Sequence, residues 1–281
     1  MKRISLDETV STNRYAKELP EDERHELTLV TAEYQEAGRG AGTNKWESER
    51  SQNLLFSIIA YPRQLFATQL FALSEITALA ICDTLNSYAE GFQIKWPNDI
   101  YFDDKKAVGM LIENDLQGKQ VYRSVIGVGV NINQTLFRSD APNPVSLAQI
   151  LGHEENRSQV LEQIMEQFTH YYDMMEEERY GELHQLYMKH LYRKDALHSY
   201  ADEGGIFQAR IHDVEPTGHL ILEDENGKLR RYDFKEVRFI VNGNGNDNGN
   251  DNGNVNGNGN DNGNDNGNDN GNDNGNEMVN D

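Results

Sequence analysis

The stretch IYFDDKKAVGMLIE, from Ile100 to Glu113, contains two apolar runs separated by four charged residues. The runs Ile100–Phe102 and Ala107–Glu113 have the side chains of short strands, and DDKK at Asp103–Lys106 is typical of a tight connection between them. Strands that follow one another with short links favour a largely antiparallel or mixed sheet. This stretch therefore indicates an α+β protein.

Similar runs lie on both sides of this stretch. Upstream, β-branched or aromatic residues gather at Leu27–Thr31, Leu54–Tyr61 and Phe92–Trp96, and downstream they gather at Val121–Val130. Each run is short and is bounded by polar or glycine-rich sequence, as strands are. The α+β fold is thus expected to contain a mixed β-sheet together with helices.

Two segments have helical spacing instead. Thr68–Glu90 places its apolar side chains mostly on one face and ends at Gly91, and Val145–Leu191 repeats apolar residues at helix spacing. The Met and Tyr residues of the second segment are interpreted as packing residues rather than as a cofactor site. Its His184 and His190 are interpreted as part of a solvated helix surface, not as metal ligands.

The chain divides into three parts by composition. From Gly205 the pattern alternates as in short strands, with turns at EPTG and ENG, which predicts a small closed β unit such as an SH3-like barrel. We expect a larger domain over 1–198, this appended unit over 199–241, and a tail over 242–281. The tail is almost purely Asn, Gly and Asp, so it cannot bury enough apolar surface to offset its ordering entropy and is expected to be disordered. Without it, roughly 42% of the residues are hydrophobic, enough for an ordinary core.

Charge and cysteine content restrict the classes of partner and compartment. The formal net charge is −21, and the tail carries eight of these charges, so the remainder is still strongly acidic. Because its Lys and Arg are scattered, this remainder should repel a phosphate backbone, and nucleic-acid binding is not expected. The single cysteine, Cys82, excludes an internal disulfide and favours a reducing compartment. The sequence has no apolar signal core and no run of eighteen apolar residues, so we expect a cytoplasmic protein without a membrane partner.

A glycine-rich loop, GRGAGTNKW at Gly38–Trp46, is the first candidate site. Its closely spaced glycines expose backbone N–H groups and let the chain approach a ligand, and the planar fork of Arg39 suits a carboxylate or a phosphate. A dinucleotide motif would open a helix, whereas polar residues and another strand follow here, and a P-loop would need Gly-Lys-Ser/Thr. The loop therefore predicts an anion site, with a flexible surface loop as the alternative.

A second candidate is KWPNDI, from Lys95 to Ile100. Pro97 fixes its own φ and holds Trp96 in an extended conformation, so the Lys95 side chain leaves the strand in a determined direction. A lysine at a strand end is usually solvated. A phosphate held by the glycine loop would nevertheless need a second cation where charge develops, so we expect Lys95 and Arg39 to face the same anion.

Two glycine-bearing strands complete the pattern. Gly109 lies in KAVGMLIE, and Gly127 and Gly129 lie in IGVGVNIN. Glycine inside a strand marks a bulge or the close approach of something flat. Asn131, at the end of the second strand, could contact a purine or a ribose, and a structural role in the turn is equally open.

Five pieces now stand in one order between Thr9 and Asn133: STN at Ser11–Asn13, Gln35 with the GRG loop, KWPNDI, KAVGMLIE and GVGVNIN. In this order and spacing the sequence resembles the biotin protein ligases, and the small carboxy-terminal β unit fits as well. The resemblance implies a class II synthetase-like catalytic domain over 1–198 that binds biotin and ATP, followed by the SH3-like domain. It implies formation of biotinyl-5'-AMP and pyrophosphate, and then transfer of biotin to a lysine.

The resemblance also assigns site residues. Lys95 and Arg39 would be catalytic, and Lys95 would neutralise the charge that grows on the α-phosphate. The biotin-binding residues it implies are Ser11, Thr12, Asn13, Gln35, Gly38, Arg39, Gly40, Ala41, Lys95 and Gly109. The residues it implies for ATP and the adenylate are Arg39, Asn44, Trp46, Lys95 and Asn131. No side chain is assigned to a metal, and Mg²⁺ would accompany the leaving pyrophosphate.

The implied partner is the acceptor lysine of a biotin carboxyl carrier protein or domain, and a homodimer is left open.

Two features depart from the family pattern. The loop has Ala41, Gly42 and Thr43 where many members carry a second basic residue, so its hold on the adenylate is expected to be weaker, with Lys45 as the remaining cation. Only ten residues precede Ser11, so the amino-terminal DNA-binding domain of some members is not expected. The alternatives are a lipoate ligase of related fold, against which WPND argues, and a non-catalytic biotin-binding or sensing protein.

Overall fold

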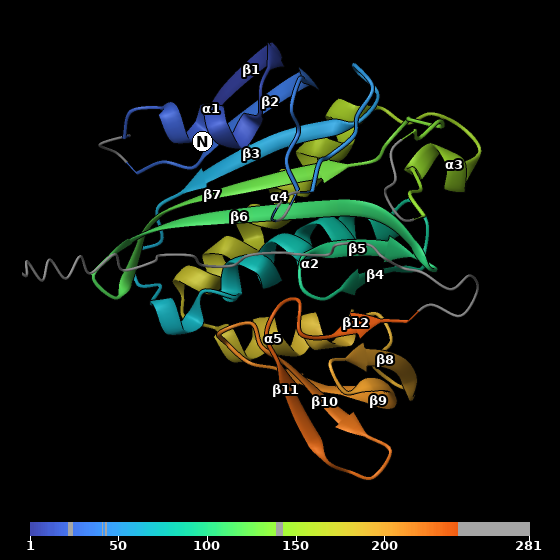
Figure 1. Ribbon diagram of the computed structural model, residues 1–281. Helices are drawn as coiled ribbons and strands as arrows, with labels where there is room; N and C mark the ends of the chain where they lie inside the picture. Colours follow the sequence, from blue (N-terminus) through green and yellow to red (C-terminus); the bar gives the residue numbers. More distant parts are fainter. Residues whose placement is uncertain (22–24, 41, 43, 139–142, 241–281) are drawn as a thin grey trace, which may run out of the picture.

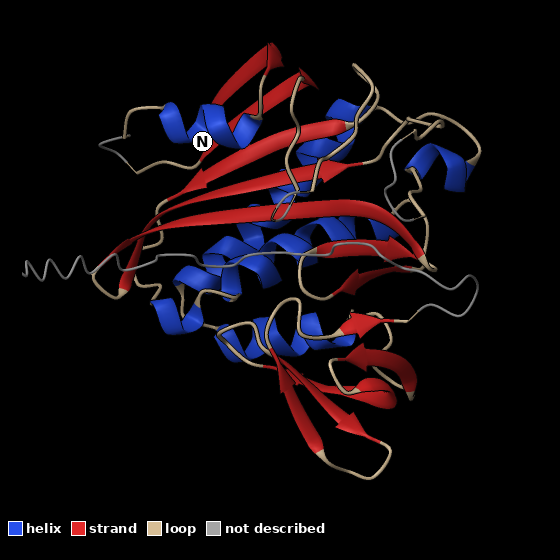
Figure 2. Ribbon diagram, viewed as in Figure 1, coloured by secondary structure: helices blue, strands red, loops and turns tan. Residues whose placement is uncertain are grey.

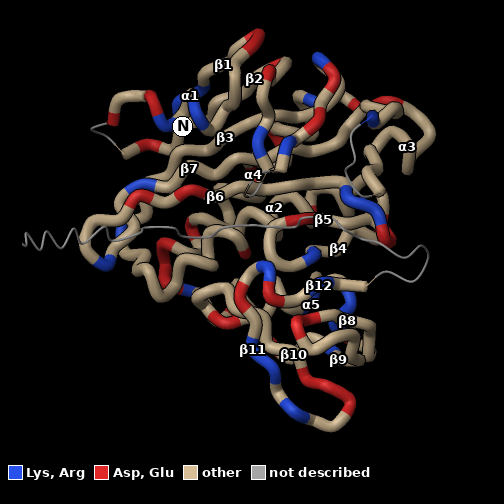
Figure 3. The backbone as a smooth tube through the Cα atoms, in the orientation of Figure 1, with Lys and Arg blue, Asp and Glu red and all other residues tan. Residues whose placement is uncertain are grey.

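The computed structural model describes residues 1–21, 25–40, 42, 44–138 and 143–240 (Figure 1). The predictions made for Ala41 and for the tail over 242–281 lie outside these residues. Two β-sheets and a group of helices make up the described chain, as expected for an α+β protein. Figure 3 shows Lys and Arg interspersed with Asp and Glu along the described chain.

A seven-stranded sheet forms the larger part of the molecule. Its order is β1-β2-β3-β7-β6-β5-β4. β1 and β2 pair in parallel and every other neighbouring pair is antiparallel, so the predicted mixed sheet is confirmed. The strands are β1 (Lys2–Thr9), β2 (Thr28–Gln35), β3 (Leu54–Ala60), β4 (Phe92–Lys95), β5 (Asp99–Phe102), β6 (Lys105–Gln117) and β7 (Gln120–Val130).

The two faces of this sheet are covered differently (Figure 2). One face packs on α2 (Ala72–Asn86) and α4 (Arg157–Glu176), whose apolar residues join strand residues such as Ile58 and Val108 in the main core. The opposite face carries α1 (Thr12–Glu18), where Ala16 packs in a separate small cluster. The remaining helices are η1 (Ala67–Gln69), α3 (Leu147–Leu151) and α5 (Tyr180–Lys189).

The central helix α2 is shorter than the predicted Thr68–Glu90. It ends at Asn86 because the side-chain Oδ1 of that residue accepts from the backbone N–H groups of Gly91 and Phe92, each at 3.0 Å. The sequence missed β1, whose side chains are mostly exposed, and α1, which is only seven residues long. Each element has only two apolar side chains, too few to form the periodic patterns on which the predictions relied.

A second sheet of five antiparallel strands follows, in the order β11-β10-β9-β8-β12. Its core is continuous with that of the larger sheet, since Tyr200 and Leu220 belong to the same buried cluster as Phe71 and Ile94. The strands are β8 (His198–Asp202), β9 (Gly205–Val214), β10 (Leu220–Asp224), β11 (Leu229–Tyr232) and β12 (Arg238–Phe239).

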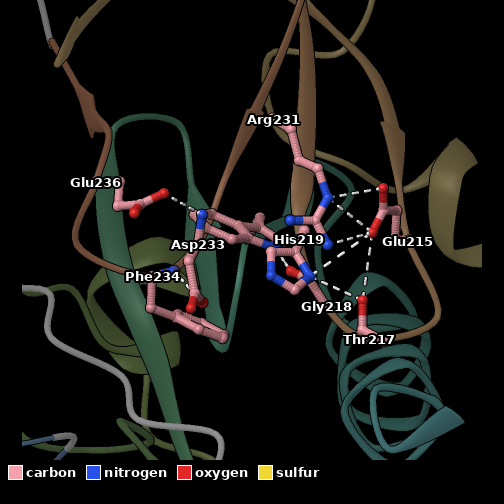
Figure 4. A network of polar contacts seen from close by, with 9 residues as sticks. Glu215, Thr217, Gly218, His219, Arg231, Asp233, Phe234 and Glu236 are labelled. Carbon is pink, nitrogen blue, oxygen red and sulfur yellow. Dashed lines mark hydrogen bonds and ion pairs between the residues drawn. The ribbon is translucent and has the colours of Figure 1, made fainter. Parts of the chain in front are cut away.

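The β9–β10 turn joins the two sheets at the KWP segment. Figure 4 shows how this turn is held: Arg231 Nη2 donates to Glu215 Oε2 at 2.9 Å, and Thr217 Oγ1 lies 2.8 Å from His219 Nδ1. The turn presents the carbonyl of Gly218 to Trp96, whose Nε1 donates to it at 2.9 Å. The Trp96 side chain is therefore fixed from the second sheet.

His184 connects α2 to β9, so its interpretation as part of a solvated helix surface was wrong. His184 Nδ1 lies 2.8 Å from Glu75 Oε1 of α2, and its Nε2 lies 2.8 Å from Asp213 Oδ1 of β9. His190 is likewise paired, with Nε2 at 3.1 Å from Asp83 Oδ1. Neither side chain belongs to a simply solvated helix surface.

In the described part of the chain, no helix has the length and apolar character needed to cross a membrane.

Candidate active site

The register of the large sheet aligns one row of residues across four strands. Lys95 pairs with Asp99, Asp99 with Gly109, and Gly109 with Gly129. Directly paired residues project from the same face of a sheet. All four therefore belong to the face that carries α1, opposite to α2 and α4.

A cavity lies over the middle of this row. It brings together residues from the start of α1, the end of β2, the glycine loop and the row itself. Of the predicted residues, its wall contains Ser11, Thr12, Asn13, Gln35, Arg39, Gly40, Asn44, Trp46 and Gly109. Wall residues that the sequence did not assign to a site include Asn98, Asp99, Lys106, Met110, Leu111, Gly127 and Gly129.

Hydrogen bonds fix the end of the cavity formed by Ser11–Asn13. The backbone N–H of Thr12 donates to Gln35 Oε1 at 2.7 Å. The Ser57 hydroxyl lies 2.6 Å from Asn13 Oδ1 and 2.8 Å from Thr12 Oγ1. Asn13 Nδ2 donates to the carbonyl of Leu111 at 3.1 Å and to Glu113 Oε2 at 3.0 Å. The two side-chain amides of this end therefore have defined orientations.

The sequence reasoning missed Ser57 as a contact of this site. Ser57 is fully buried in β3, within the apolar run LLFSIIAY. A hydroxyl that is buried without exposure needs a partner, so a lone serine in such a run is the signal that could have found it.

The glycines of β6 and β7 leave room for Asn13 and Trp46 to lie against the sheet, which a Cβ at these positions would prevent. A Cβ at Gly127 would stand 2.2 Å from Asn13 Oδ1, so glycine is required for α1 to lie this close to β7. A Cβ would stand 2.7 Å from Trp46 Cζ3 at Gly109, and 2.3 Å from Trp46 Cε2 at Gly129. The flat group that the glycines were predicted to accept is thus the Trp46 indole.

The glycine loop returns on itself as a narrow hairpin. Gly40 N donates to the Asn44 carbonyl at 2.8 Å, Trp46 N donates to the Gly38 carbonyl at 2.9 Å, and Arg39 forms an antiparallel bridge with Lys45. Gly38 stands at the base of this hairpin, outside the cavity wall. The Arg39 side chain is half exposed, with Nη1 3.8 Å from Glu113 Oε1.

Lys95 lies at the far end of the row, beyond the cavity wall. Its side chain is buried, and Nζ lies 4.8 Å from the Tyr101 ring centroid and 5.4 Å from that of Phe239. Between Lys95 and the cavity stands Asp99, whose Oδ2 is 2.8 Å from Lys106 Nζ. The structure thus places Lys95 on the same face of the sheet as the cavity, but against two rings and outside the wall that contains Arg39.

Two buried polar atoms near the cavity have no hydrogen-bond partner within the described residues. They are Trp46 Nε1, in the wall, and Asn131 Oδ1. The other end of the Asn131 side chain, Nδ2, lies 3.5 Å from the carbonyl of Lys106, so Asn131 adjoins the wall without entering it. Desolvated groups of this kind cost free energy unless a partner arrives.

Comparison with known proteins identifies the relatives of this site. Residues 5–131 match the model of the Biotin/lipoate A/B protein ligase family, a span that contains all five sequence pieces except the end of the last. The bifunctional ligase/repressor BirA of Bacillus spizizenii is 31% identical over 248 residues, which cover 82% of this chain and 71% of that protein. The chain belongs to the biotin protein ligase family. The biotin--[acetyl-CoA-carboxylase] ligase of Paracoccus denitrificans is 26% identical over 71% of this chain and 85% of its own length.

Solved structures of biotin protein ligases share the fold. That of Aquifex aeolicus, in complex with biotin and ATP, superposes with a TM-score of 0.71 at 24% identity and covers 85% of this chain and 99% of that chain. The ligase of Leishmania major in complex with biotinyl-5-AMP superposes with a TM-score of 0.58 at 20% identity. At these identities the likeness extends to the fold alone.

Proposed function

We propose that this biotin protein ligase joins biotin to ATP, giving biotinyl-5'-AMP and pyrophosphate, and then transfers the biotinyl group to a lysine of a biotin carboxyl carrier domain. In the first step a carboxylate oxygen of biotin attacks the α-phosphorus and pyrophosphate leaves. In the second, the acceptor amine attacks the carbonyl carbon of the mixed anhydride, loses a proton, and AMP leaves.

The polarity of the Ser11–Asn13 end is the observation that carries this proposal. Gln35 Oε1 is occupied by the Thr12 N–H, so Gln35 presents its Nε2 donor to a ligand. Asn13 Nδ2 is occupied by Leu111 and Glu113, and Ser57 takes one lone pair of Oδ1, so Asn13 presents the other lone pair of Oδ1 as an acceptor. One donor beside one acceptor matches the C=O and N–H groups of the biotin urea.

The same polarity supports biotin over lipoate, the alternative that a family model covering both kinds of ligase leaves open. The dithiolane ring of lipoate has neither a carbonyl nor an N–H group. Binding it would bury the Gln35 Nε2 donor without a ligand acceptor and leave the second lone pair of Asn13 Oδ1 without a ligand donor. Sites built on such hydrogen bonds reject analogues that lack them strongly.

The remaining predicted residues would act on the phosphate. Charge develops on the α-phosphate oxygens as pyrophosphate departs, and preorganised donors and cations stabilise it. Arg39 and the loop N–H groups would approach from the hairpin side. Lys95 would act from the far side of Asp99. Trp46 Nε1 and Asn131 Oδ1, which lack partners among the described residues, would contact the nucleoside. Lys95 and Arg39 are the two residues on which the rate would depend most.

Mg²⁺ is proposed to enter with ATP. No cluster of three or more His, Cys, Asp or Glu side chains occurs among the residues that the structure describes. Mg²⁺ is commonly held by substrate phosphates, waters and at most one or two carboxylates, so a protein cage is not required. When bound, the ion would draw charge from the leaving pyrophosphate.

Other predictions accompany this proposal. We propose that the five-stranded sheet is the SH3-like domain of the family and that the carrier domain is the protein partner. The cytoplasmic location stays a prediction of the sequence.

Isotope exchange between pyrophosphate and ATP tests the first step. We expect exchange with biotin and Mg²⁺, at least 100-fold slower exchange with lipoate, and labelling of a carrier domain after the two steps combine. Faster exchange with lipoate would make the protein a lipoate ligase. Biotin binding by calorimetry without any exchange would make it a binding or sensing protein.

A further inference from the structure

We propose that Glu113, which does not line the cavity, is a positioning residue that sets biotin affinity by fixing the orientation of the Asn13 carboxamide. The inference rests on the proposed function, because it assigns Asn13 to the biotin urea. The KAVGMLIE motif ends in Glu113 without giving it a role, and Glu113 lies outside the cavity wall, because its carboxylate reaches the site only through other side chains. Its place at the end of the KAVGMLIE run puts it on β6, beside α1.

The Asn13 amide has two possible orientations, and its neighbours select one. On the nitrogen side lie two acceptors, the Leu111 carbonyl at 3.1 Å and Glu113 Oε2 at 3.0 Å. On the oxygen side lies the Ser57 hydroxyl at 2.6 Å. A flipped amide would place Oδ1 against a carbonyl and a carboxylate, with no donor for either. Hydrogen bonds to a charged group are stronger than those to a neutral one, so Glu113 contributes most to this selection.

The selected orientation decides what a ligand meets. With Nδ2 held away, the free lone pair of Asn13 Oδ1 remains for a ligand N–H. Because the side chain lies over Gly127, with no room for a Cβ between them, it cannot move toward β7 to find another arrangement. Loss of the Glu113 acceptor therefore acts on biotin binding rather than on the phosphate chemistry.

The second oxygen of Glu113 keeps the carboxylate paired independently of the glycine loop. Lys17 Nζ of α1 lies 2.8 Å from Oε1, and Arg39 Nη1 lies 3.8 Å from the same atom. If Arg39 turns to the phosphate during the reaction, Lys17 still balances the charge of Glu113. Glu113 can then hold Asn13 through the whole reaction.

Four variants test the proposal through biotin affinity, measured by calorimetry, and through KM and kcat in pyrophosphate exchange. Glu113→Leu should raise Kd and KM for biotin by about 10-fold to 150-fold, the range for a lost hydrogen bond to a charged group, with kcat changed by less than about 2-fold. Glu113→Gln retains an acceptor and should stay within about 3-fold of the parent. Lys17→Met, the matched control, should also stay within about 3-fold.

The fourth variant, Asn13→Asp, tests the role of Glu113 even if Glu113→Leu fails to fold. It places a second carboxylate against Glu113 and should weaken biotin by at least about 10-fold. Adding Glu113→Gln should then recover at least about 5-fold. Parent-like biotin affinity in Glu113→Leu, a fall in kcat at constant KM, or no recovery in the double variant would each overturn the inference.

The side-chain amide signals of Asn13 in NMR spectra separate this inference from the proposed function. We expect these signals to shift in Glu113→Leu and not in Lys17→Met, whether or not biotin binds. If the parent neither binds nor activates biotin, the proposed function fails, and unchanged Asn13 signals would refute the role of Glu113 on their own.

Discussion

The two ends of the cavity differ in how far their polar groups are already hydrogen-bonded within the protein. The Ser11–Asn13 end, where they are, is called the prepared end. At the Ser11–Asn13 end, the amides of Asn13 and Gln35 are oriented by bonds within the protein, and Ser57 closes the network. At the other end, Trp46 Nε1 and Asn131 Oδ1 lack partners among the described residues. One end thus presents fixed polarity before any ligand arrives, whereas the other has groups that a ligand must satisfy.

This difference suits a reaction in which one substrate stays in place while its neighbour changes. Biotin remains in its position through activation and transfer, so a rigid pocket for its head costs little ordering on binding. The nucleotide loses pyrophosphate and later leaves as AMP, so its surroundings must make and break contacts. The half-exposed Arg39 side chain is accessible for such contacts.

Replacing Lys95 should give the largest effect, and it would fall on one end only. Lys95→Ala is expected to slow adenylate formation by about 10² to 10³, the usual cost of removing a preorganised stabilising group, while biotin affinity stays within about 3-fold. Pyrophosphate exchange and calorimetry measure the two quantities. Lys105→Ala, at the exposed first residue of β6, is the matched control and should behave as the parent does. Adenylation by Lys95→Ala at the parental rate would remove Lys95 from the mechanism.

The second largest effect is expected from Gly127→Ala, which adds a methyl group at the Ser11–Asn13 end of the cavity. Gly127→Ala places a Cβ where it would stand 2.2 Å from Asn13 Oδ1, and α1 cannot yield without breaking its bonds to Leu111 and Glu113. Overpacking of this kind costs about 1–3 kcal/mol, so biotin affinity should fall by roughly 5-fold to 150-fold. Gly181→Ala, which meets no atom within 4 Å on α5, should leave affinity unchanged. Equal biotin affinities for the two variants would show that the Ser11–Asn13 end can adjust its structure and is not rigid.

The sequence predicted the glycine loop, the STN triplet and the strand glycines because each is a local pattern of residues. It missed Ser57 and Glu113, since what they contact depends on how α1 lies across β3, β6 and β7. It placed Lys95 at a strand end but not against the ring of Phe239, which lies 144 positions later in the chain. His184 was misread for the same reason, because its partners Glu75 and Asp213 lie 109 and 29 residues away. Contacts between distant segments leave no periodic signal.

The second sheet should influence the Lys95 end but not the prepared end. Phe239 of β12 supplies one of the two rings beside Lys95 Nζ, and such cation–π contacts contribute about 0.5–2 kcal/mol. Phe239→Leu is therefore expected to slow adenylation by roughly 2-fold to 30-fold at constant biotin affinity, with recovery in Phe239→Tyr. Ile206→Ala, on the exposed side of β9, is the control. A change in biotin affinity without a change in rate would contradict this division between the two ends.

The joint between the sheets should also respond to pH, with the smallest effect. The hydrogen bond to Glu75, assisted by Asp213, raises the pKa of His184 from 6.5 to about 9. A raised pKa in the folded state means that folding favours the protonated form, so the stabilisation is complete below about pH 6.5 and is lost as the pH rises through about 9. We therefore expect the parent to unfold at a higher temperature than His184→Gln at pH 6, with the gap narrowing toward pH 10. His212→Gln, at a half-exposed histidine of β9 next to Asp213, is the matched control. Because solvent reaches about a third of the His184 side chain, the gap should amount to a few degrees. A gap that stays constant from pH 6 to pH 10 would mean that packing rather than charge accounts for what His184 contributes between α2 and β9.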